Sequence, residues 1–408
     1  MVQDFLLKSG SERGDPRERP NLSIPAERRF MNDIIPEEAL ITMEERFGTR
    51  LVRHTASEPD AEEPFASVFP QSAAEVESLT RLAARHRMPL VARGAGTALY
   101  PSKVPRALLV RFDAMRNMRL PEESQEEWVE VEPGVTWMAL EERLRERDMG
   151  PRVYPTSAPR STVGGWLAEN GLGVGSYEYG WLLQNVVFVE AVLAGGERSV
   201  IEGEDLRHFV GSRGSMGFFV RARLATRRAD EDLPVGAVFR NTEDLGNAVL
   251  NLYRSGVPLW HLGFLNAGMA HARGLEEGHV LFGAYPEGRS SWVESAFRKA
   301  VESRRGRVYS PEEAGRIWEQ RFFPAGPLRR TPTPGRALVQ GARLAATLAE
   351  IERKLAGVAI QGTVARWGEV ALLAFDPARE SEGLVDLSAA TDVKLLRVAG
   401  RSWMPERR

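Results

Sequence analysis

Three glycine-rich stretches between residues 93 and 217 have the composition of turns that hold an anion. The first reads Arg93-Gly94-Ala95-Gly96-Thr97, the second includes Ser161-Thr162-Val163-Gly164-Gly165, and the third reads Gly211-Ser212-Arg213-Gly214-Ser215-Met216-Gly217. Because glycine has no Cβ, backbone N–H groups in such turns can approach a phosphate closely. A helix that begins directly after the turn adds the positive end of its dipole. Together the three turns predict a ligand that carries phosphate.

The two commonest nucleotide-binding motifs do not fit these turns. A nicotinamide fingerprint requires a third glycine three residues after Gly96, where Leu99 stands. A P-loop requires a glycine followed by Lys-Ser or Lys-Thr, and no glycine of the chain meets this condition. Simpler interpretations stay open: a strand-to-helix connection for the first turn, and a helix cap before residues 163–169 for Ser161 and Thr162.

The composition limits the chemistry that the chain can perform unaided. The 408 residues include no cysteine, which excludes disulfides, thiolate nucleophiles and iron–sulfur ligation, so redox chemistry would need a bound cofactor. With 54 basic and 56 acidic residues the net charge is -2, and we expect no nucleic-acid partner. No apolar stretch approaches the ~20 residues of a membrane span, and the first residues lack an apolar core for export. We therefore expect a soluble cytoplasmic protein.

Apolar patterns predict the elements that must position the turns. A strand at 89–92 leads into the first turn, and a strand at 218–226 follows the third. Ser72 and Thr136 are predicted to cap helices that extend to His86 and Leu144. The remaining expected strands are 67–69, 107–112, 128–132, 186–193, 198–201, 235–239, 260–265, 279–284, 357–360 and 368–375, and the remaining helices are 36–47, 242–254 and 290–304.

Six of these features stand in the order and spacing of one flavoprotein family. They are Pro70-x-Ser72 before a helix, the first glycine turn, Glu132-Pro-Gly-Val-Thr136, Ser157-Ala158-Pro159-x-Ser161-Thr-Val-Gly-Gly165, Tyr179-Gly180 and Gly211-Ser-x-Gly-x-x-Gly217. The segment from about 63 to 228 resembles the FAD-binding domain of the vanillyl-alcohol oxidase and p-cresol methylhydroxylase family (PCMH type). The resemblance implies an α+β fold, in which two α/β subdomains hold FAD and a smaller antiparallel-sheet α+β domain covers it.

The resemblance also implies a role for each motif and a division of the chain. Residues 93–97 and Gly164-Gly165 would hold the diphosphate, with help from Ser161 and Thr162, and Gly217-Phe218-Phe219 would border the adenine. The full set of expected FAD contacts is Arg93, Gly94, Ala95, Gly96, Thr97, Pro155, Ser157, Ala158, Ser161, Thr162, Gly164, Gly165, Tyr179, Gly211, Gly214, Gly217, Phe218 and Phe219. We expect an N-terminal arm (1–40), an FAD-binding domain (41–228), a cap or substrate domain (229–375) and a loosely held tail (376–408).

The chain departs from the family pattern at three places. Relatives that attach flavin through a histidine in the first loop carry it near Thr97 or Ala98, and this chain does not, so FAD is expected to be noncovalent. A link to a histidine of the second domain is the open alternative. An acid is common where Arg213 stands, and an arginine is common where Glu178 stands. A compensating contact between these two residues and two independent substitutions are both open interpretations.

The cap domain is expected to supply the groups that face the flavin. The candidates are His261, His271, His279, Tyr285, Trp318 and Arg321, of which His261, Arg321 and Tyr285 are the predicted catalytic residues. Arg321 lies in a Trp-x-x-Arg segment similar to one that lies near the substrate carboxylate in relatives, and an arginine fork suits a carboxylate. The alternative for Arg321 is a solvated arginine at a helix end. His279 lies in an apolar strand pattern, which favours a core histidine. No metal site is expected.

Two functions follow from the resemblance. The first is a self-sufficient FAD-linked oxidoreductase that takes a hydride from a small 2-hydroxy acid or alcohol. The second is the smaller FAD-binding subunit of a complex similar to glycolate dehydrogenase, beside a second flavoprotein and an iron–sulfur subunit. The domain after residue 230 is closer in size to that subunit, and no histidine-rich signature occurs late in the chain, so the second function stays open as the alternative to the first. A protein that kept the domain and lost the cofactor is a third interpretation.

Overall fold

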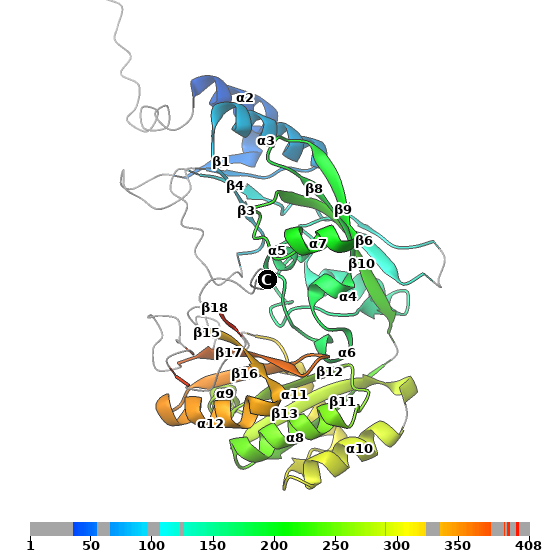
Figure 1. Ribbon diagram of the computed structural model, residues 1–408. Helices are drawn as coiled ribbons and strands as arrows, with labels where there is room; N and C mark the ends of the chain where they lie inside the picture. The colour runs from blue at the N-terminus through cyan, green and yellow to red at the C-terminus, as the bar shows by residue number, and fades with distance from the viewer. Residues whose placement is uncertain are drawn as a thin grey trace, which may run out of the picture.

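A computed structural model describes residues 36–54, 66–96, 107–122, 126–229, 231–289, 291–323 and 335–376, with short pieces at 387, 390–391 and 397–399. Three sheets follow one another along the long axis of the molecule (Figure 1). The first two sheets contain the strands before residue 229, and the third contains the strands after it. The mixture of helices and sheets confirms the predicted α+β class, while the domain boundaries stay predictions.

The first sheet is small and mainly parallel. Its order is β1 (Leu51–Arg53), β2 (Ala66–Val68), β4 (Leu108–Arg111) and β3 (Leu90–Arg93), and β2 and β3 both run parallel to β4. Helices α2 (Glu37–Phe47) and α3 (Ala73–His86) pack on it through apolar side chains such as Met43 and Leu79. The Ser72 hydroxyl accepts a hydrogen bond from the Glu75 amide (3.3 Å), which confirms the predicted cap. This sheet delivers the first glycine turn at the end of β3.

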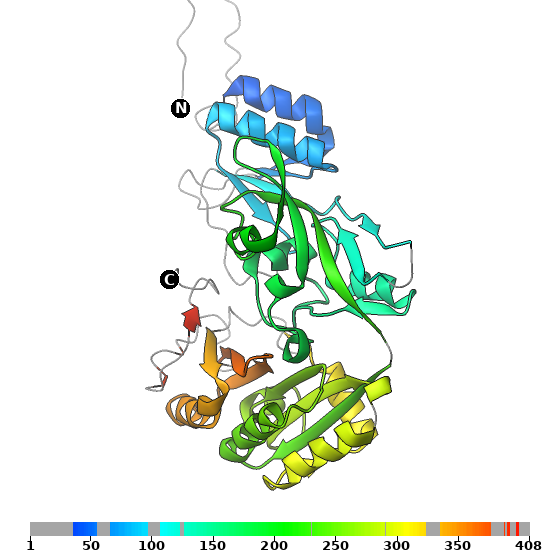
Figure 2. The same cartoon turned by 45° about the vertical axis from the view of Figure 1, so that its right-hand side comes forward.

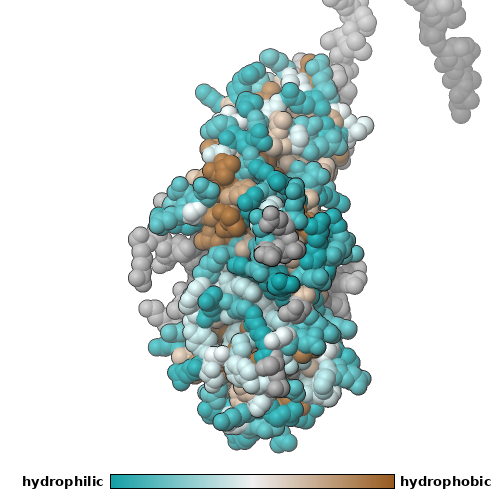
Figure 3. Space-filling model, turned by 90° about the vertical axis from the view of Figure 1, so that its right-hand side faces the viewer, coloured by the Kyte–Doolittle hydropathy of each residue, from teal (hydrophilic) through white to brown (hydrophobic). Residues whose placement is uncertain are grey.

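The second sheet is antiparallel and carries the other two glycine turns on its connections. Its order is β5 (Met118–Arg119), β6 (Trp128–Val131), β10 (Phe218–Arg228), β8 (Val186–Val192) and β9 (Arg198–Glu202), with β7 (Met149–Pro151) also paired to β10. The connections include the helices α4 (Trp137–Arg145), α5 (Val163–Glu169), α6 (Ser176–Tyr179) and α7 (Leu206–Phe209). Figure 3, which faces the side where β6 and β9 lie, shows a small brown patch on a mostly hydrophilic surface. Exposed Val187 and Val200 on β8 and β9 are among the apolar side chains of this sheet.

The third sheet is antiparallel and covered on both faces. Its order is β14 (Arg307–Val308), β11 (Asp232–Phe239), β13 (His279–Pro286), β12 (His261–Leu265), β16 (Ala359–Val364), β17 (Glu369–Phe375), β15 (Gly335–Gln340) and β18 (Arg397–Ala399). Helices α8 (Thr242–Arg254), α10 (Ser291–Glu302) and α12 (Leu344–Lys354) lie together below it (Figures 1 and 2). Helices α9 (Ala267–Ala272) and α11 (Pro311–Glu319) pack against the other face.

Two expectations from the sequence need correction or completion. The tail after residue 376 was expected to be loosely held, but β18 pairs antiparallel with β15 and forms an edge of the third sheet. The N-terminal arm lies mostly outside the described residues. The sequence analysis also missed α9, α11, α12 and β15. For α11 a signal was present, because Ser310 and Glu313 form a capping box and Pro311 occupies the first helical position.

Candidate functional site

The first and second glycine turns lie against each other. A Cβ on Gly94 would stand 2.5 Å from Thr162 Oγ1 and 3.4 Å from Gly165 Cα, so only glycine permits this approach. Gly96 has a φ of +70°, in the region that favours glycine. Arg93, Ala95 and Gly96 are exposed, and Thr97 lies outside the described residues. The turn after β3 therefore meets the start of α5, and its backbone is open to a ligand.

The two hydroxyl groups before α5 have different partners. Thr162 Oγ1 accepts a hydrogen bond from the Gly165 amide (3.2 Å), so the helix-cap interpretation holds for Thr162. The Ser161 side chain is only 4% exposed, and its hydroxyl has no hydrogen-bond partner among the described residues. A buried hydroxyl without a partner is costly, and such groups in native proteins normally bind something. Gly164 is fixed by packing, because a Cβ there would lie 2.5 Å from Pro133 Cβ.

The third turn is attached to the same helix. The amides of Gly211 and Arg213 donate to the carbonyl oxygens of Leu167 (2.8 Å) and Ala168 (2.9 Å) in α5. A Cβ on Gly214 would lie 3.8 Å from Ala92 Cβ on β3, which feeds the first turn. The structure therefore brings all three glycine turns together around α5 and the end of β3.

The end of the third turn passes directly into β10. Gly217 has a φ of +140°, and a Cβ there would lie 2.5 Å from the Val192 carbonyl oxygen, so this position requires glycine. Phe218 and Phe219 follow and are both buried: Phe218 packs in the core of the first sheet and Phe219 in that of the second. The Ser212 hydroxyl in this turn is also buried without a partner among the described residues.

The segment from Pro155 to Ala158 links the second turn to the third sheet. The Ala158 amide donates to the Pro155 carbonyl (2.9 Å), and Ser157 O accepts from the Ser161 amide (3.0 Å). The Phe323 amide, which follows α11, donates to the Thr156 carbonyl (2.8 Å). This segment is thus held between the glycine turns and the candidate substrate residues.

Tyr179 and its neighbour Glu178 lie on α6, close to where the second sheet meets the third. The Arg152 guanidinium stacks over the half-buried Tyr179 ring at 5.3 Å. Glu178 accepts two hydrogen bonds from Arg289, which follows β13 of the third sheet (2.5 and 2.7 Å). Arg213 instead pairs with Glu169 at 3.4 Å. The two departures from the family pattern therefore do not compensate each other by direct contact.

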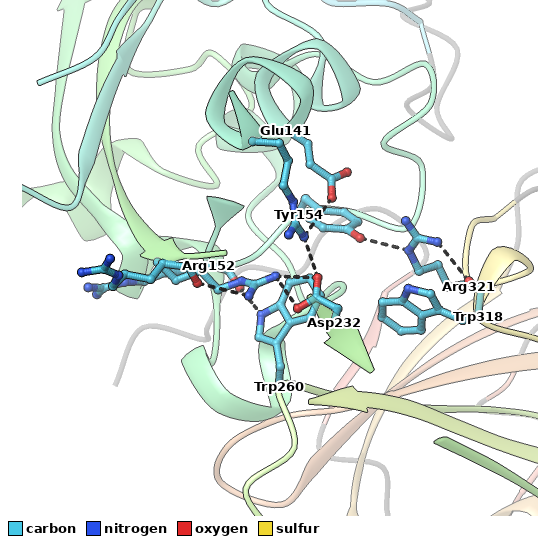
Figure 4. A network of polar contacts seen from close by, with 10 residues as sticks. Glu141, Arg152, Tyr154, Asp232, Trp260, Trp318 and Arg321 are labelled. Atoms are coloured by element: carbon cyan, nitrogen blue, oxygen red, sulfur yellow. Dashed lines mark hydrogen bonds and ion pairs between the residues drawn. The ribbon is translucent and has the colours of Figure 1, made fainter. Parts of the chain in front are cut away.

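Arg321 and Tyr154 face each other across the two halves of the molecule (Figure 4). Arg321 Nε donates to the Tyr154 hydroxyl (3.0 Å), and Nη1 donates to the Trp318 carbonyl (3.0 Å). The guanidinium also stacks over the rings of Trp318 (4.7 Å) and Phe322 (4.2 Å). Arg321 is therefore held in one orientation by several contacts, unlike a solvated arginine. Burial raises the pKa of Tyr154, which keeps the phenol protonated.

His261 lies beside this pair and carries no charge at neutral pH. Its ring centroid is 5.7 Å from that of Trp318 and 5.6 Å from that of Phe282. Burial, with the positive charge of Arg321, lowers the pKa of His261 to about 3. A base with so low a pKa accepts protons poorly, and Nδ1 is buried without a hydrogen-bond partner among the described residues.

The other candidates for the flavin face lie elsewhere. On β13, Ala284 pairs with His261, whereas the next residue, Tyr285, packs in the core beneath α8, α10 and α12. Tyr285 is therefore on the opposite face of the sheet from His261, and burial raises its pKa. His279 is buried and accepts a hydrogen bond from the Ala267 amide (3.3 Å), as expected for a core histidine. His271 is exposed. The structure brings together His261, Trp318 and Arg321 but neither Tyr285 nor the other histidines.

The sequence analysis missed several polar residues of this site. Gln361 on β16 donates through Nε2 to the Arg321 carbonyl (2.9 Å), and Arg273 after α9 donates to the Phe322 carbonyl (3.0 Å). Neither residue belongs to a motif, and both reach the site only because of strand order and helix placement. Tyr154 stands directly before Pro155 in the second glycine region, so its place in the motif was a usable signal.

A buried ion pair marks the crossing from the second sheet to the third (Figure 4). Arg227 at the end of β10 donates from Nη2 to both carboxylate oxygens of Asp232 on β11 (2.8 and 2.9 Å), and Arg145 contacts the same carboxylate at 2.6 Å. The Arg227 guanidinium lies 3.7 Å from the centre of the Trp260 ring, and Trp260 Nε1 donates to the Arg152 carbonyl (3.0 Å). These contacts fix β11 and β12 relative to the glycine turns.

Comparison with known proteins identifies the part of the chain that holds the first two glycine turns. Residues 64–201 match the protein family described as an FAD binding domain. This segment is an FAD-binding domain. The finding confirms the cofactor, FAD, and the resemblance to PCMH-type flavoproteins. The solved structure of p-cresol methylhydroxylase with bound substrate agrees in fold, with a TM-score of 0.66 and 15% identity over 84% of this chain and 83% of that one.

Curated relatives of this FAD-binding chain are longer proteins. The probable mitochondrial D-lactate dehydrogenase of Danio rerio is 29% identical over 224 residues, which cover 51% of this chain and 44% of the relative. The glycolate oxidase subunit GlcD of Bacillus subtilis is 30% identical over 170 residues, which cover 39% and 36%. The chain therefore matches less than half of the length of these relatives.

The glycine turns fit the FAD diphosphate on structural grounds as well. Where the three turns meet, a Cβ at Gly94, Gly164 or Gly217 would clash with neighbouring atoms, and the buried Ser161 hydroxyl beside them has no partner among the described residues. Within the described ranges, no helix is long and apolar enough to cross a membrane. The same residues contain no group of three or more histidine, aspartate and glutamate side chains that can hold a metal ion.

Proposed function

We propose that the chain is an FAD-dependent oxidoreductase that takes a hydride from a small 2-hydroxy acid or alcohol and holds FAD noncovalently. The observation that supports this most is that the converged glycine turns lie next to the Tyr154–Arg321 pair. The two are joined by the hydrogen bond from the Phe323 amide to the Thr156 carbonyl. A cofactor site and an anion-binding side chain thus lie on neighbouring segments. The names of the relatives, which act on lactate or glycolate, support a 2-hydroxy acid.

The chain's own residues would divide the work between cofactor and substrate. The backbone at 93–96 and 164–165, with the Ser161 hydroxyl, would bind the diphosphate. Bound flavin supplies the chemistry of hydride acceptance from an activated C–H group. Arg321 presents a guanidinium that no described carboxylate neutralises by an ion pair, and such a fork binds a carboxylate with two parallel hydrogen bonds.

Tyr154 and His261 would orient the substrate rather than remove its proton. The phenol of Tyr154 accepts from Arg321 and keeps its own O–H to donate, because burial holds its pKa above the usual value. His261, with a pKa lowered to about 3 mainly by burial, is a neutral hydrogen-bonding group. Tyr285 lies on the far face of the sheet, and we assign it no contact with the substrate.

Anaerobic mixing of the reconstituted protein with single substrates tests the proposal. Bleaching of the flavin absorption by D-lactate, glycolate or another 2-hydroxy acid is the expected result. The variant Arg321→Leu should raise the KM of a carboxylate substrate ~100-fold, and should change the reaction of an uncharged alcohol little. A protein that binds FAD and is reduced by none of these compounds would contradict the self-sufficient enzyme.

One observation favours the alternative function, an FAD-binding subunit of a complex similar to glycolate dehydrogenase. The chain matches 36% of a relative that is itself named a subunit of glycolate oxidase. In this case the isolated chain would bind FAD and turn over slowly, and would gain activity with a second flavoprotein and an iron–sulfur subunit. Purification of the chain from its native source, followed by an iron assay of any co-purifying protein, separates the two functions. A cytoplasmic location stays a prediction under both.

A further inference from the structure

Arg273, directly after α9, is a buried cation that forms no ion pair with any carboxylate of the described residues. Its exposed fraction is 9%, and burial lowers its pKa to about 10. An unpaired buried charge is unfavourable unless hydrogen bonds replace its water shell. Its location therefore requires a specific set of acceptors.

The acceptors belong to one short segment and to one strand. Arg273 Nη1 donates to the Gln320 carbonyl, and Nη2 donates to the Phe322 carbonyl (3.0 Å) and to Gln361 Oε1 (2.7 Å). Gln361 Nε2 in turn donates to the Arg321 carbonyl (2.9 Å). Two side chains thus hold the carbonyl groups of three consecutive residues, with Arg321 in the middle.

The two side chains are themselves anchored to the third sheet. Gln361 is 1% exposed on β16 and pairs in register with Leu265 on β12. Asn266 caps α9 by accepting from the Met269 amide (2.9 Å), and its Oδ1 also accepts from the Ile360 amide (2.7 Å) next to Gln361. Since Arg273 directly follows α9, both donors keep a fixed position relative to β16.

We propose that Arg273 and Gln361 form a clamp that positions Arg321 for recognition of an anionic substrate. The clamp fixes the backbone of Arg321 from one side, while the Tyr154 hydroxyl fixes its guanidinium from the other. Loss of the clamp would leave the guanidinium present but displaced, and small displacements of a binding group lower affinity strongly. The inference rests on the proposed function, in which Arg321 binds the substrate carboxylate.

A purely structural role for Arg273 is the competing explanation. The positioning role and the structural role predict changes in different measurable quantities. A structural role lowers stability and the amount of folded holoprotein, but leaves the affinity of the folded fraction unaltered. A positioning role raises the KM for a carboxylate and weakens the binding of anions, while kcat changes little. The affinity of folded holoprotein is therefore the quantity to measure.

The test is a titration of the holoprotein with oxalate, a small dicarboxylate, followed by the flavin absorption spectrum. The same titration is made on the variants Arg273→Met, Arg273→Lys and Gln361→Met. Arg50→Met is the control for lost stability away from the site, because Arg50 donates to the Phe69 carbonyl (3.0 Å) and pairs with Glu75 (2.6 Å) at the first sheet. We expect ~10-fold weaker oxalate binding and a similar rise in KM for Arg273→Met and Gln361→Met. Arg273→Lys should keep part of the affinity, and Arg50→Met should keep all of it.

The outcomes separate the clamp from the proposed function. Equal oxalate affinity in wild type, Arg273→Met and Gln361→Met would overturn the clamp and leave the function intact. A wild-type protein that neither binds oxalate nor is reduced by a 2-hydroxy acid would overturn both. If Arg273→Met does not fold, Gln361→Met decides, because it removes the hydrogen bond to the Arg321 carbonyl while Arg273 keeps its two backbone acceptors.

Discussion

The two sides of the candidate site are built in different ways. On the FAD-binding side the site consists of backbone and small side chains, and a Cβ at Gly94, Gly164 or Gly217 would meet neighbouring atoms at 2.5 Å. On the third-sheet side it consists of long side chains, Arg321, Trp318 and His261, held by hydrogen bonds and ring contacts. On the FAD-binding side the residue type is limited by the space between backbone segments. On the third-sheet side it is limited by the orientation that each long side chain must keep.

This difference explains what each side can tolerate. A change of residue type at a constrained glycine affects the backbone that would meet the cofactor. A change at a long side chain of the third sheet leaves the FAD-binding turns in place and alters only what binds beside them. One cofactor domain can therefore serve different substrates through changes in the second half of the chain.

The largest effect is expected from Gly165→Val. A Cβ at this position would lie 3.1 Å from Thr162 Oγ1, a tight contact with a side-chain hydroxyl, and would meet no other atom within 4 Å. The added methyl groups would cover the amides beside the first turn, and we expect complete loss of FAD from an otherwise folded protein. The measurement is the flavin absorption of purified protein after incubation with excess FAD, together with a thermal melt.

Gly315→Ala is the control for this variant. Gly315 lies in α11, has open space around its Cα and no positive φ, and should accept alanine with unchanged FAD content. Normal flavin absorption in Gly165→Val would show that the second turn does not approach the diphosphate.

A smaller but clear effect is expected where the two sides join. Asp232→Asn leaves Arg227, whose side chain is 3% exposed, without its carboxylate partner. Removing one member of a buried pair costs about 3 kcal/mol, and the free energy of unfolding in urea measures it. Glu312→Gln, which breaks an exposed pair with Arg316, should leave this free energy nearly unchanged. Equal values for both variants would mean that the Arg227–Asp232 pair does not stabilise the crossing.

The comparison of the two sides also explains what the sequence could predict. The strand before the first turn, the Ser72 and Thr136 caps and helix α8 over Thr242–Arg254 were predicted because each depends on neighbouring residues. The three glycine turns could be predicted from the sequence for the same reason, since each turn needs only its own residues to be small. Their convergence followed from the family resemblance, not from any local signal.

The third-sheet side could not be predicted because it depends on register and strand order. Tyr285 and Ala284 are neighbours in the chain, but only Ala284 shares a face with His261, and a shift of one residue reverses this. Gln361 reaches Arg321 because β16 lies beside β12, two strands separated by almost a hundred residues of sequence. The sequence pattern gives the alternation along each strand but not which strands are neighbours.

The difference in the pH dependence of stability between wild type and a His261 variant probes the third-sheet side. His261 has a pKa near 6.5 when unfolded, and burial lowers it to about 3 in the folded protein. Between these values the unfolded state binds more protons, so the contribution of His261 to stability is complete above pH 6.5 and falls as the pH is lowered toward 3. In wild type the loss should reach about 1 kcal/mol per pH unit more than in His261→Gln, measured by urea unfolding. Parallel pH profiles would show that the imidazole is not buried in neutral form.

The smallest effects should separate two adjacent hydroxyl groups on the FAD-binding side. Thr162→Ala removes the cap of α5 and should lower the free energy of unfolding of the FAD-free protein by about 1 kcal/mol. Ser161→Ala removes a buried hydroxyl that has no partner among the described residues, so the FAD-free protein should lose no stability and can gain some. In the presence of FAD we expect the larger loss of affinity for Ser161→Ala, because the Ser161 hydroxyl has no partner among the described residues, whereas Thr162 Oγ1 already accepts from the Gly165 amide. Urea unfolding without FAD and FAD titration by fluorescence measure the two quantities. If Ser161→Ala destabilises the FAD-free protein and binds FAD as well as wild type does, the Ser161 hydroxyl serves the fold, and the cofactor is held by backbone amides alone.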